Sequence, residues 1–122
     1  MPQISVDYSA NLADTFDRQA LGLALNQLAV KHLDAAPEGC KTRFRPVDGT
    51  VVVGELAQEQ DLVLAAFHIF PGRSPEAKAG LSEAVLELLA ERLTPAPGRR
   101  LHAAVDVVEI DRDFYRGTVL GG

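Results

Sequence analysis

The sequence is poor in features on which several large classes of protein depend. Cys40 is the only cysteine among 122 residues, which excludes an intrachain disulfide and is typical of a reducing cytoplasm. The net charge is −5, and no run of Lys or Arg supplies a phosphate-neutralising surface for nucleic acid. No signal pattern opens the chain, and no apolar run approaches the roughly 18 residues of a membrane span. We expect a soluble, cytoplasmic protein with no nucleic-acid or membrane partner.

Motifs for several kinds of chemistry are also missing. We find no phosphate loop, no nucleophile motif and no pair of carboxylates at a plausible site. His32, His68 and His102 are scattered without metal-site spacing, so we expect them to pack or hydrogen-bond structurally. The sequence therefore predicts neither a metal nor a cofactor.

The composition is that of one globular domain covering residues 1–122. Apolar residues make up 47% of the chain and charged residues 24%, which is not the composition of a disordered protein. A chain of this length can bury an ordinary core, and it is better supported if it oligomerises.

The amino terminus carries the candidate base. Methionine before a small residue such as Pro2 is normally removed, which would leave a free secondary amine at the start of a strand. An α-amino group ordinarily titrates near ~7.7–8.0, and burial beside cations would lower its pKa. A neutral amine can take a proton from carbon next to a carbonyl. Met-Pro is also a frequent start of protein chains and can have no functional significance. If Met1 is retained, the proline nitrogen is an amide and is not basic.

The first half of the chain predicts a strand, a helix and further extended chain. Apolar and polar residues alternate over 3–8, the period of a half-buried strand. After a polar turn at 9–12, Asp14 or Thr15 can cap a helix that runs to about Leu33.

This predicted helix has two apolar faces. One face carries Leu21, Ala24, Leu25, Leu28 and His32. Nearly opposite, a seven-residue seam consists of Phe16, Leu23 and Val30. One face can cover a sheet, and the other calls for a second partner, which can belong to another subunit.

Breakers at 34–39 end the helix, and 41–54 reads as extended with a kink at Pro46. Asp48-Gly49 can instead form a hairpin turn there, so the number of short strands stays open.

The second half repeats the order strand, helix, strand. Residues 62–70 are almost wholly apolar, the pattern of a central strand covered on both faces. Ser74 is a good N-cap and Pro75 suits the first helical position of a helix that extends to about Leu93. The valine-rich segment 101–110 is the last long strand. The whole predicts an α+β domain of doubled β-α-β type, with both helices on one face of a four-stranded mixed sheet.

Three places in this chain resemble the 5-carboxymethyl-2-hydroxymuconate isomerase family of the tautomerase superfamily. They are Pro2 at the head of a strand, Tyr8-Ser9-Ala10-Asn11-Leu12 at its end, and Gly72-Arg73-Ser74 before the second helix. The resemblance implies a homotrimer whose sheets face inward, and an isomerase or tautomerase of aromatic compound catabolism. It implies a cofactor-free proton shift in an unsaturated 2-hydroxy or 2-oxo diacid.

The same resemblance assigns roles to individual residues. Pro2 would be the base and Arg73 would hold carboxylate or carbonyl oxygens of the substrate, beside a helix amino terminus that favours anions. Lys41 stands where the family has an arginine, and a lysine cannot grip a carboxylate with a two-pronged fork. Arg43 and Arg45 alternate with apolar Phe44 and share a sheet face, which either binds substrate carboxylate or is solvated.

The carboxyl-terminal segment, including Phe114, is expected to wall the pocket of a neighbouring subunit. Two other functions stay open. A proline that remains protonated would act as an acid, as in hydratases, dehalogenases and decarboxylases of the superfamily. A trimeric binding protein of the same fold would have no catalysis at all.

Overall fold

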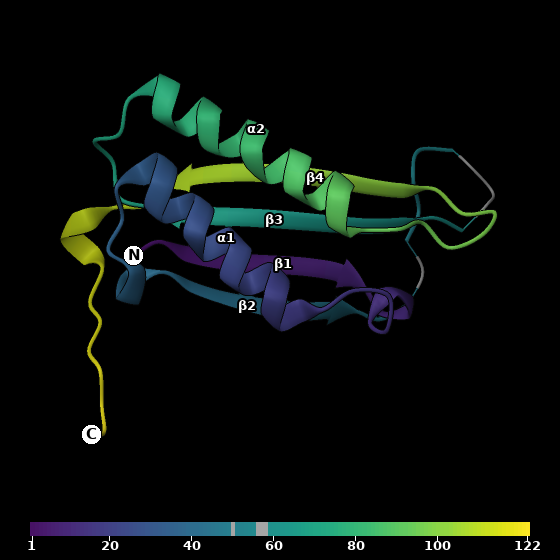
Figure 1. The fold of residues 1–122 in the computed structure, drawn as a ribbon, viewed down its shortest axis with the longest axis horizontal. Coiled ribbons are helices and arrows are strands. Elements are labelled where there is room, and N and C mark those ends of the chain that lie inside the picture. The colour runs from purple at the N-terminus through teal and green to yellow at the C-terminus, as the bar shows by residue number, and fades with distance from the viewer. Residues whose placement is uncertain (50, 56–58) are drawn as a thin grey trace.

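Two helices cover one face of a single mixed sheet (Figure 1). The structure is a computed structural model, and it describes residues 1–49, 51–55 and 59–122. The strands of the described residues are β1 (Gln3–Ser9), β2 (Lys41–Val47), β3 (Asp61–Ile69) and β4 (Leu101–Glu109). The helices are α1 (Arg18–Leu33) and α2 (Pro75–Arg92), and short 3-10 turns are η1 (Ala10–Leu12), η2 (Pro37–Gly39) and η3 (Arg112–Phe114).

The sheet order is β2-β1-β3-β4, which joins two β-α-β units side by side. Strand β2 runs parallel to β1, and β4 runs parallel to β3, whereas β1 and β3 are antiparallel. Each parallel pair is connected through one helix, and both helices lie on the same side of the sheet in Figure 1. The predicted α+β fold of doubled β-α-β type is confirmed.

The core lies between the sheet and the helices. Alternate residues of the inner strands point into it, and the helices supply leucine, valine and alanine at helical spacing. Its largest fully buried side chains are Tyr8, Phe67, Ile4, Leu12, Leu21, Leu25, Ile69, Leu81, Leu89, Val6, Val63 and Val85. Burying one such side chain contributes about 1.5–3 kcal/mol, so the two central strands carry much of the stability.

No described residue of the single chain forms a layer over the opposite face of the sheet, which corrects the expectation for β3. Burial alternates along this strand, and Leu64 is 37% exposed while His68 is also exposed. Right-handed crossovers put both helices on one side, so neither helix covers the apolar side chains on the other side.

The beginning of α1 differs from the prediction. Asp17 is the N-cap, and its side chain accepts a hydrogen bond from the backbone N–H of Ala20 at 3.0 Å. Thr15 instead donates through its hydroxyl to the Leu12 carbonyl at 2.6 Å. At α2 the prediction is confirmed: Ser74 accepts from the N–H of Ala77 at 3.1 Å, and Pro75 begins the helix.

The seven-residue seam is also wrong in part. Phe16 precedes α1 and packs edge-on against the ring of Tyr8, with centroids 5.6 Å apart, and near Phe44 at 6.3 Å. The Phe16 ring is partly buried and packs against the edge of the hydrophobic core. Leu23 is 57% exposed, so of the seam only this residue presents a large open apolar surface.

Strand β2 continues through Pro46 to Val47, and no kink ends it. Proline lacks an N–H donor, and an edge strand tolerates it because one side of the strand makes no ladder bonds. Residues 51–55 do not form a strand, so the described part of the segment predicted as extended contains the single strand β2; residue 50 lies outside the described residues. Neither helix of the described ranges combines the length and apolar character that a membrane crossing needs.

Candidate active site

The candidate base lies where several element ends meet, at the left of Figure 1. Pro2 is buried directly before β1, and its carbonyl accepts a hydrogen bond from the backbone N–H of Lys41 at 3.2 Å. Gly39 approaches Met1 so closely that a Cβ on it would lie 3.0 Å from the Met1 carbonyl oxygen. The amino terminus is therefore fixed against the η2 turn and the start of β2.

Two cations act on the terminal amine. The pKa of this amine, carried here by Met1, lies below its ordinary value of 8.0, first because of burial and then because of Lys41 and Arg73. Cys40 acts in the opposite direction, with an effect smaller than that of Lys41 and larger than that of Arg73. The amine of Pro2 is one residue further along and adjoins the same start of β2. The structure thus brings Pro2, Lys41 and Arg73 to one end of the sheet.

Arg73 is half-buried between the two helices. Its Nε donates to the carbonyl of Leu33, the last residue of α1, at 3.2 Å, and its Nη1 donates to the carbonyl of Phe70 at 3.5 Å. The carbonyls at a helix carboxyl terminus carry partial negative charge, which a guanidinium neutralises. These bonds hold Arg73 by one edge, and among the described residues its Nη2 has no hydrogen-bond acceptor.

The three cations of β2 share the uncovered sheet face, as their alternation predicted. Lys41, Arg43 and Arg45 pair in register with Gln3, Ser5 and Asp7 of β1. Two residues of strand advance about 6.6 Å, so Arg43 lies one such step from Lys41, and Arg45 lies two.

Arg45 differs from its neighbours because it has a partner. Its Nε donates to the Asp7 carboxylate at 2.9 Å. Lys41 donates weakly to the Gly39 carbonyl at 3.5 Å, and no acceptor for the Arg43 guanidinium occurs among the described residues. Arg43 and Lys41 are therefore better placed than Arg45 to receive an anion near Pro2.

The carboxyl-terminal segment turns one aromatic residue toward this end and one away. Phe114 is 82% exposed, whereas the Tyr115 hydroxyl accepts a hydrogen bond from Nε2 of Gln3 at 3.3 Å. The Tyr115 ring meets the ring of Phe70 edge-on, with centroids 5.5 Å apart. Sequence reasoning singled out Phe114 and missed Tyr115 and Gln3. No local signal separates the two aromatic residues, because a 3-10 turn points successive side chains in different directions.

Cys40 has the surroundings of a structural residue. It is buried, its thiol donates to the Ala36 carbonyl at 3.5 Å, and burial raises the pKa of the thiol. The thiol is therefore protonated and is not a nucleophile in this environment.

The three histidines lie in separate places. The ring of His32 lies against α2, where a Cβ on Gly80 would be 3.3 Å from its Nδ1. His102 hydrogen-bonds through Nε2 with the side chain of Gln60, and His68 is exposed on β3. In the described part of the chain no three His, Cys, Asp or Glu residues are grouped as metal ligands.

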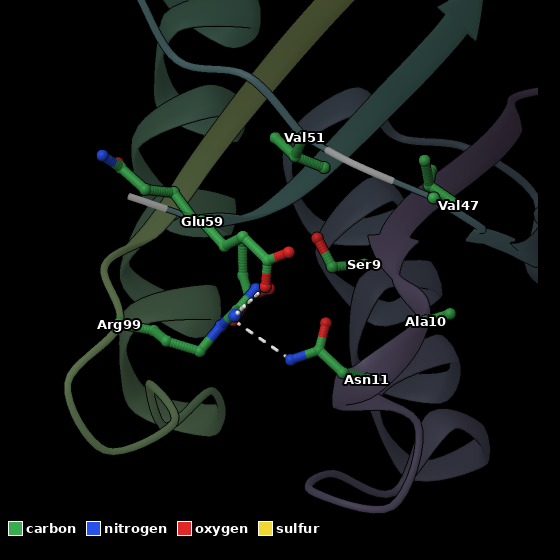
Figure 2. Close-up of a pocket in the computed structure, with 10 residues that line it drawn as sticks. Ser9, Ala10, Asn11, Val47, Val51, Glu59 and Arg99 are labelled. Atoms are coloured by element: carbon green, nitrogen blue, oxygen red, sulfur yellow. Dashed lines mark hydrogen bonds and ion pairs between the residues drawn. The ribbon is translucent and has the colours of Figure 1, made fainter. Parts of the chain in front are cut away.

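A cavity of about 270 Å³ opens at the other end of the sheet (Figure 2). Arg99 and Asn11 reach into it from different segments, and both hydrogen-bond to the carboxylate of Asp61, which is 1% exposed. Arg99 donates to Asp61 at 3.0 and 2.8 Å and to Glu59 at 2.9 Å. The hydrogen bonds from Arg99 hold the pKa of Asp61 below its ordinary range. Because these charges satisfy one another, the cluster fastens the segment after β1 and the segment before β4 to the beginning of β3, and we do not expect it to be the reactive site.

Comparisons with known proteins identify the family. A family model of 5-carboxymethyl-2-hydroxymuconate isomerase matches residues 2–116. No curated protein matches the chain. Among solved structures, a 5-carboxymethyl-2-hydroxymuconate isomerase from Deinococcus radiodurans R1 is 20% identical, with a TM-score of 0.79 over 96% of this chain and 88% of that one.

Two further structures show how widely the fold occurs. A macrophage migration inhibitory factor from Oncomelania hupensis has a TM-score of 0.72 at 17% identity, over 96% of this chain and 79% of that one. A fused 4-OT symmetric trimer has a TM-score of 0.71 at 15% identity, over 93% and 92% of the two chains. The chain belongs to the 5-carboxymethyl-2-hydroxymuconate isomerase family and is an isomerase of the tautomerase superfamily.

Proposed function

We propose that this isomerase catalyses a proton shift in an unsaturated 2-hydroxy or 2-oxo diacid, with Pro2 as the base once Met1 is removed. One observation supports this most strongly: the terminal amine of Met1, one residue before the buried Pro2, has a pKa that is lowered by burial and by Lys41 and Arg73. Both effects favour the neutral amine, which is the form that accepts a proton.

The proton shift has two parts. From a 2-oxo substrate the Pro2 nitrogen takes a proton from carbon next to the carbonyl, and the electron pair moves to the carbonyl oxygen. From a 2-hydroxy substrate it takes the proton of the hydroxyl group, which gives the same anion. The protonated amine then returns the proton to another carbon of the conjugated chain. Lys41 and Arg73 stabilise the negative charge that builds up on oxygen between these steps, and the amino terminus of α2 adds its dipole.

The cations of β2 would fix the position of the substrate along the strand. Lys41 lies beside Pro2, where it can bind the carboxylate or oxygen next to the reacting carbon. Arg43 lies about 6.6 Å further along the strand, and it would take the remote carboxylate of an extended diacid. Arg45 is a further binding candidate, although its bond to Asp7 must be broken or shared.

We propose a homotrimer for the assembly. The uncovered sheet face carries apolar side chains that need cover, and the 4-OT structures similar to this chain are described as symmetric trimers. Phe114, at 82% exposed, would contribute to a neighbouring subunit's pocket. The single buried thiol of Cys40 suits the cytoplasm that we propose as the location.

The test begins with the intact mass of the purified chain and continues with an ultraviolet assay of 2-hydroxymuconate isomerisation. A mass without Met1, catalysed isomerisation, and strongly reduced turnover in Pro2→Ala would support the proposal. The alanine variant retains a primary amine, so residual activity is expected. A retained Met1, or unchanged turnover in Pro2→Ala, would contradict the role of Pro2. An inactive wild-type chain would favour the acid chemistry of related enzymes or a binding role.

A further inference from the structure

A phenolic hydroxyl lies at the Pro2 end of the sheet, outside the proton transfer described above. Tyr115 follows η3 and is half-buried, and its hydroxyl accepts a hydrogen bond from Nε2 of Gln3 at 3.3 Å. Gln3 directly follows Pro2 in the chain and pairs with Lys41 in the sheet. In Figure 1 the η3 turn and the amino terminus occupy the same end of the molecule. The hydroxyl is thus attached to the first residue of β1.

The ring of Tyr115 makes a second contact at this end of the sheet, with a residue that follows β3. It packs edge-on against Phe70, whose carbonyl accepts a hydrogen bond from Nη1 of Arg73 at 3.5 Å. Arg112 packs its guanidinium over the Phe70 ring at 4.3 Å and donates to the Pro71 carbonyl at 3.5 Å. Tyr115 therefore joins the residue that follows Pro2 to the residue that holds Arg73.

The hydroxyl keeps a donor available. A tyrosine hydroxyl has one O–H donor besides its acceptor sites, and the bond from Gln3 uses an acceptor site. In the described ranges no group accepts from the Tyr115 O–H. Gly117 also approaches this hydroxyl closely, since a Cβ there would lie 3.0 Å from the phenolic oxygen. A glycine at this position leaves space around the donor.

We propose that Tyr115 contacts the substrate and that its O–H donates a hydrogen bond to an anionic oxygen of the unsaturated diacid. Lys41 and Arg73 attract such oxygens to this end by their charge. A neutral hydrogen-bond donor beside them adds a directional interaction that orients the oxygen. The proposal rests on the proposed function, and it gives the carboxyl-terminal segment a role in the site of its own subunit. Phe114 faces away from that site and retains its separate role toward a neighbour.

The test is Tyr115→Phe, which removes the hydroxyl and leaves a ring for the contact with Phe70. We expect kcat/KM for 2-hydroxymuconate to fall by about 10- to 100-fold, the usual effect of losing one hydrogen bond to a charged group. The chain has two tyrosines, so Tyr8→Phe is a matched control. The Tyr8 hydroxyl accepts from Nη1 of Arg18 at 2.7 Å near the far end of β1, and its loss should leave kcat/KM unchanged.

Limited trypsin digestion distinguishes a purely structural role of the Tyr115 hydroxyl from contact with the substrate, because trypsin cleaves at Arg112 and Arg116 on either side of Tyr115. If the hydroxyl only fastens the segment to Gln3, Tyr115→Phe should be cleaved faster at these arginines. A fall in kcat/KM with an unchanged cleavage rate supports the proposal. Unchanged kinetics, or a fall accompanied by faster cleavage, overturns it while the wild-type activity stands. An inactive wild-type chain overturns the proposed function itself, and this result is seen before any variant is compared.

Discussion

The backbone N–H of Lys41 donates to the carbonyl oxygen of Pro2 at 3.2 Å. This bond comes directly before the parallel ladder of β1 and β2, in which Gln3 pairs with Lys41. It brings an ammonium group to the neighbourhood of the terminal amine by means of sheet register alone. The cation that lowers the pKa of the terminal amine, carried here by Met1, is thus placed by the fold.

Removal of the Lys41 charge should change the pH dependence of the reaction. A neighbouring cation disfavours the protonated amine, so Lys41→Gln should raise the pKa of Pro2. The reaction needs the neutral amine, and the rise of kcat/KM with pH should therefore move to higher pH. Lys41→Arg keeps the charge and should keep the wild-type profile. A profile that is the same in the glutamine variant would show that Lys41 does not act on the base.

Arg73→Ala should reduce turnover by about 10²–10³, the usual effect of removing a preorganised group that stabilises developing negative charge. It should also lower the melting temperature, because the bond to the Leu33 carbonyl at the end of α1 is lost, at about 1 kcal/mol. Steady-state kinetics and thermal unfolding measure both effects. A raised KM with constant turnover would place Arg73 at a remote carboxylate instead. No change in either constant would remove it from the site.

Arg43 and Arg45 should differ in their effect on substrate binding. Arg43→Gln should raise KM for 2-hydroxymuconate about tenfold, through loss of a charged hydrogen bond to the remote carboxylate. It should leave KM for the monoacid 2-hydroxy-2,4-pentadienoate unchanged. Arg45→Gln should have the smaller effect on both substrates, because this side chain is paired with Asp7 and is 58% exposed. Equal effects of the two variants would contradict the order of the cations along β2.

The cluster in Figure 2 should control stability and not catalysis. Asp61→Asn breaks the ion pair between Asp61, which is buried, and Arg99, which is partly exposed, and it should destabilise the chain by about 1.5–3 kcal/mol at neutral pH, the usual worth of a hydrogen bond to a charged group. The pKa of Asp61 is lowered by folding, so its contribution is present above the unfolded pKa of about 3.9 and is lost as pH falls through the folded value. Denaturant unfolding should give equal free energies of unfolding for the wild type and Asp61→Asn only at acid pH. Asp14→Asn, at an exposed position, is the control.

Much of the fold follows from local patterns, and the exceptions have physical causes. The strand alternation and the Ser74 cap were predicted because each depends on neighbours in sequence. The start of α1 was not, because Asp14, Thr15 and Asp17 are all competent caps. The packing of Phe16 against Tyr8 keeps the preceding residues outside the helix, and that contact is not local.

In the candidate site, too, some features were expected from the sequence and others depend on contacts between distant parts of the chain. The roles of Pro2, Lys41 and Arg73 were expected from the family resemblance, and not from a local pattern. The antiparallel pairing of β1 and β3 then places Arg73, which follows the end of β3, near the beginning of β1. The bond between Arg45 and Asp7 depends on strand register. The choice of Tyr115 over Phe114 depends on the direction of side chains after η3, which the sequence pattern does not encode.

The proposed reaction requires an amino-terminal proline that is largely neutral when it meets the substrate. Titration of the mature chain carrying ¹⁵N-proline, followed by NMR, measures the pKa of this amine directly. We expect a pKa below the ordinary value of 8.0, because burial, Lys41 and Arg73 disfavour the charged form of the Met1 amine and would act in the same direction on the neighbouring Pro2. A pKa at or above 8.0 would contradict it, since Pro2 would then be protonated at neutral pH and could not serve as the base.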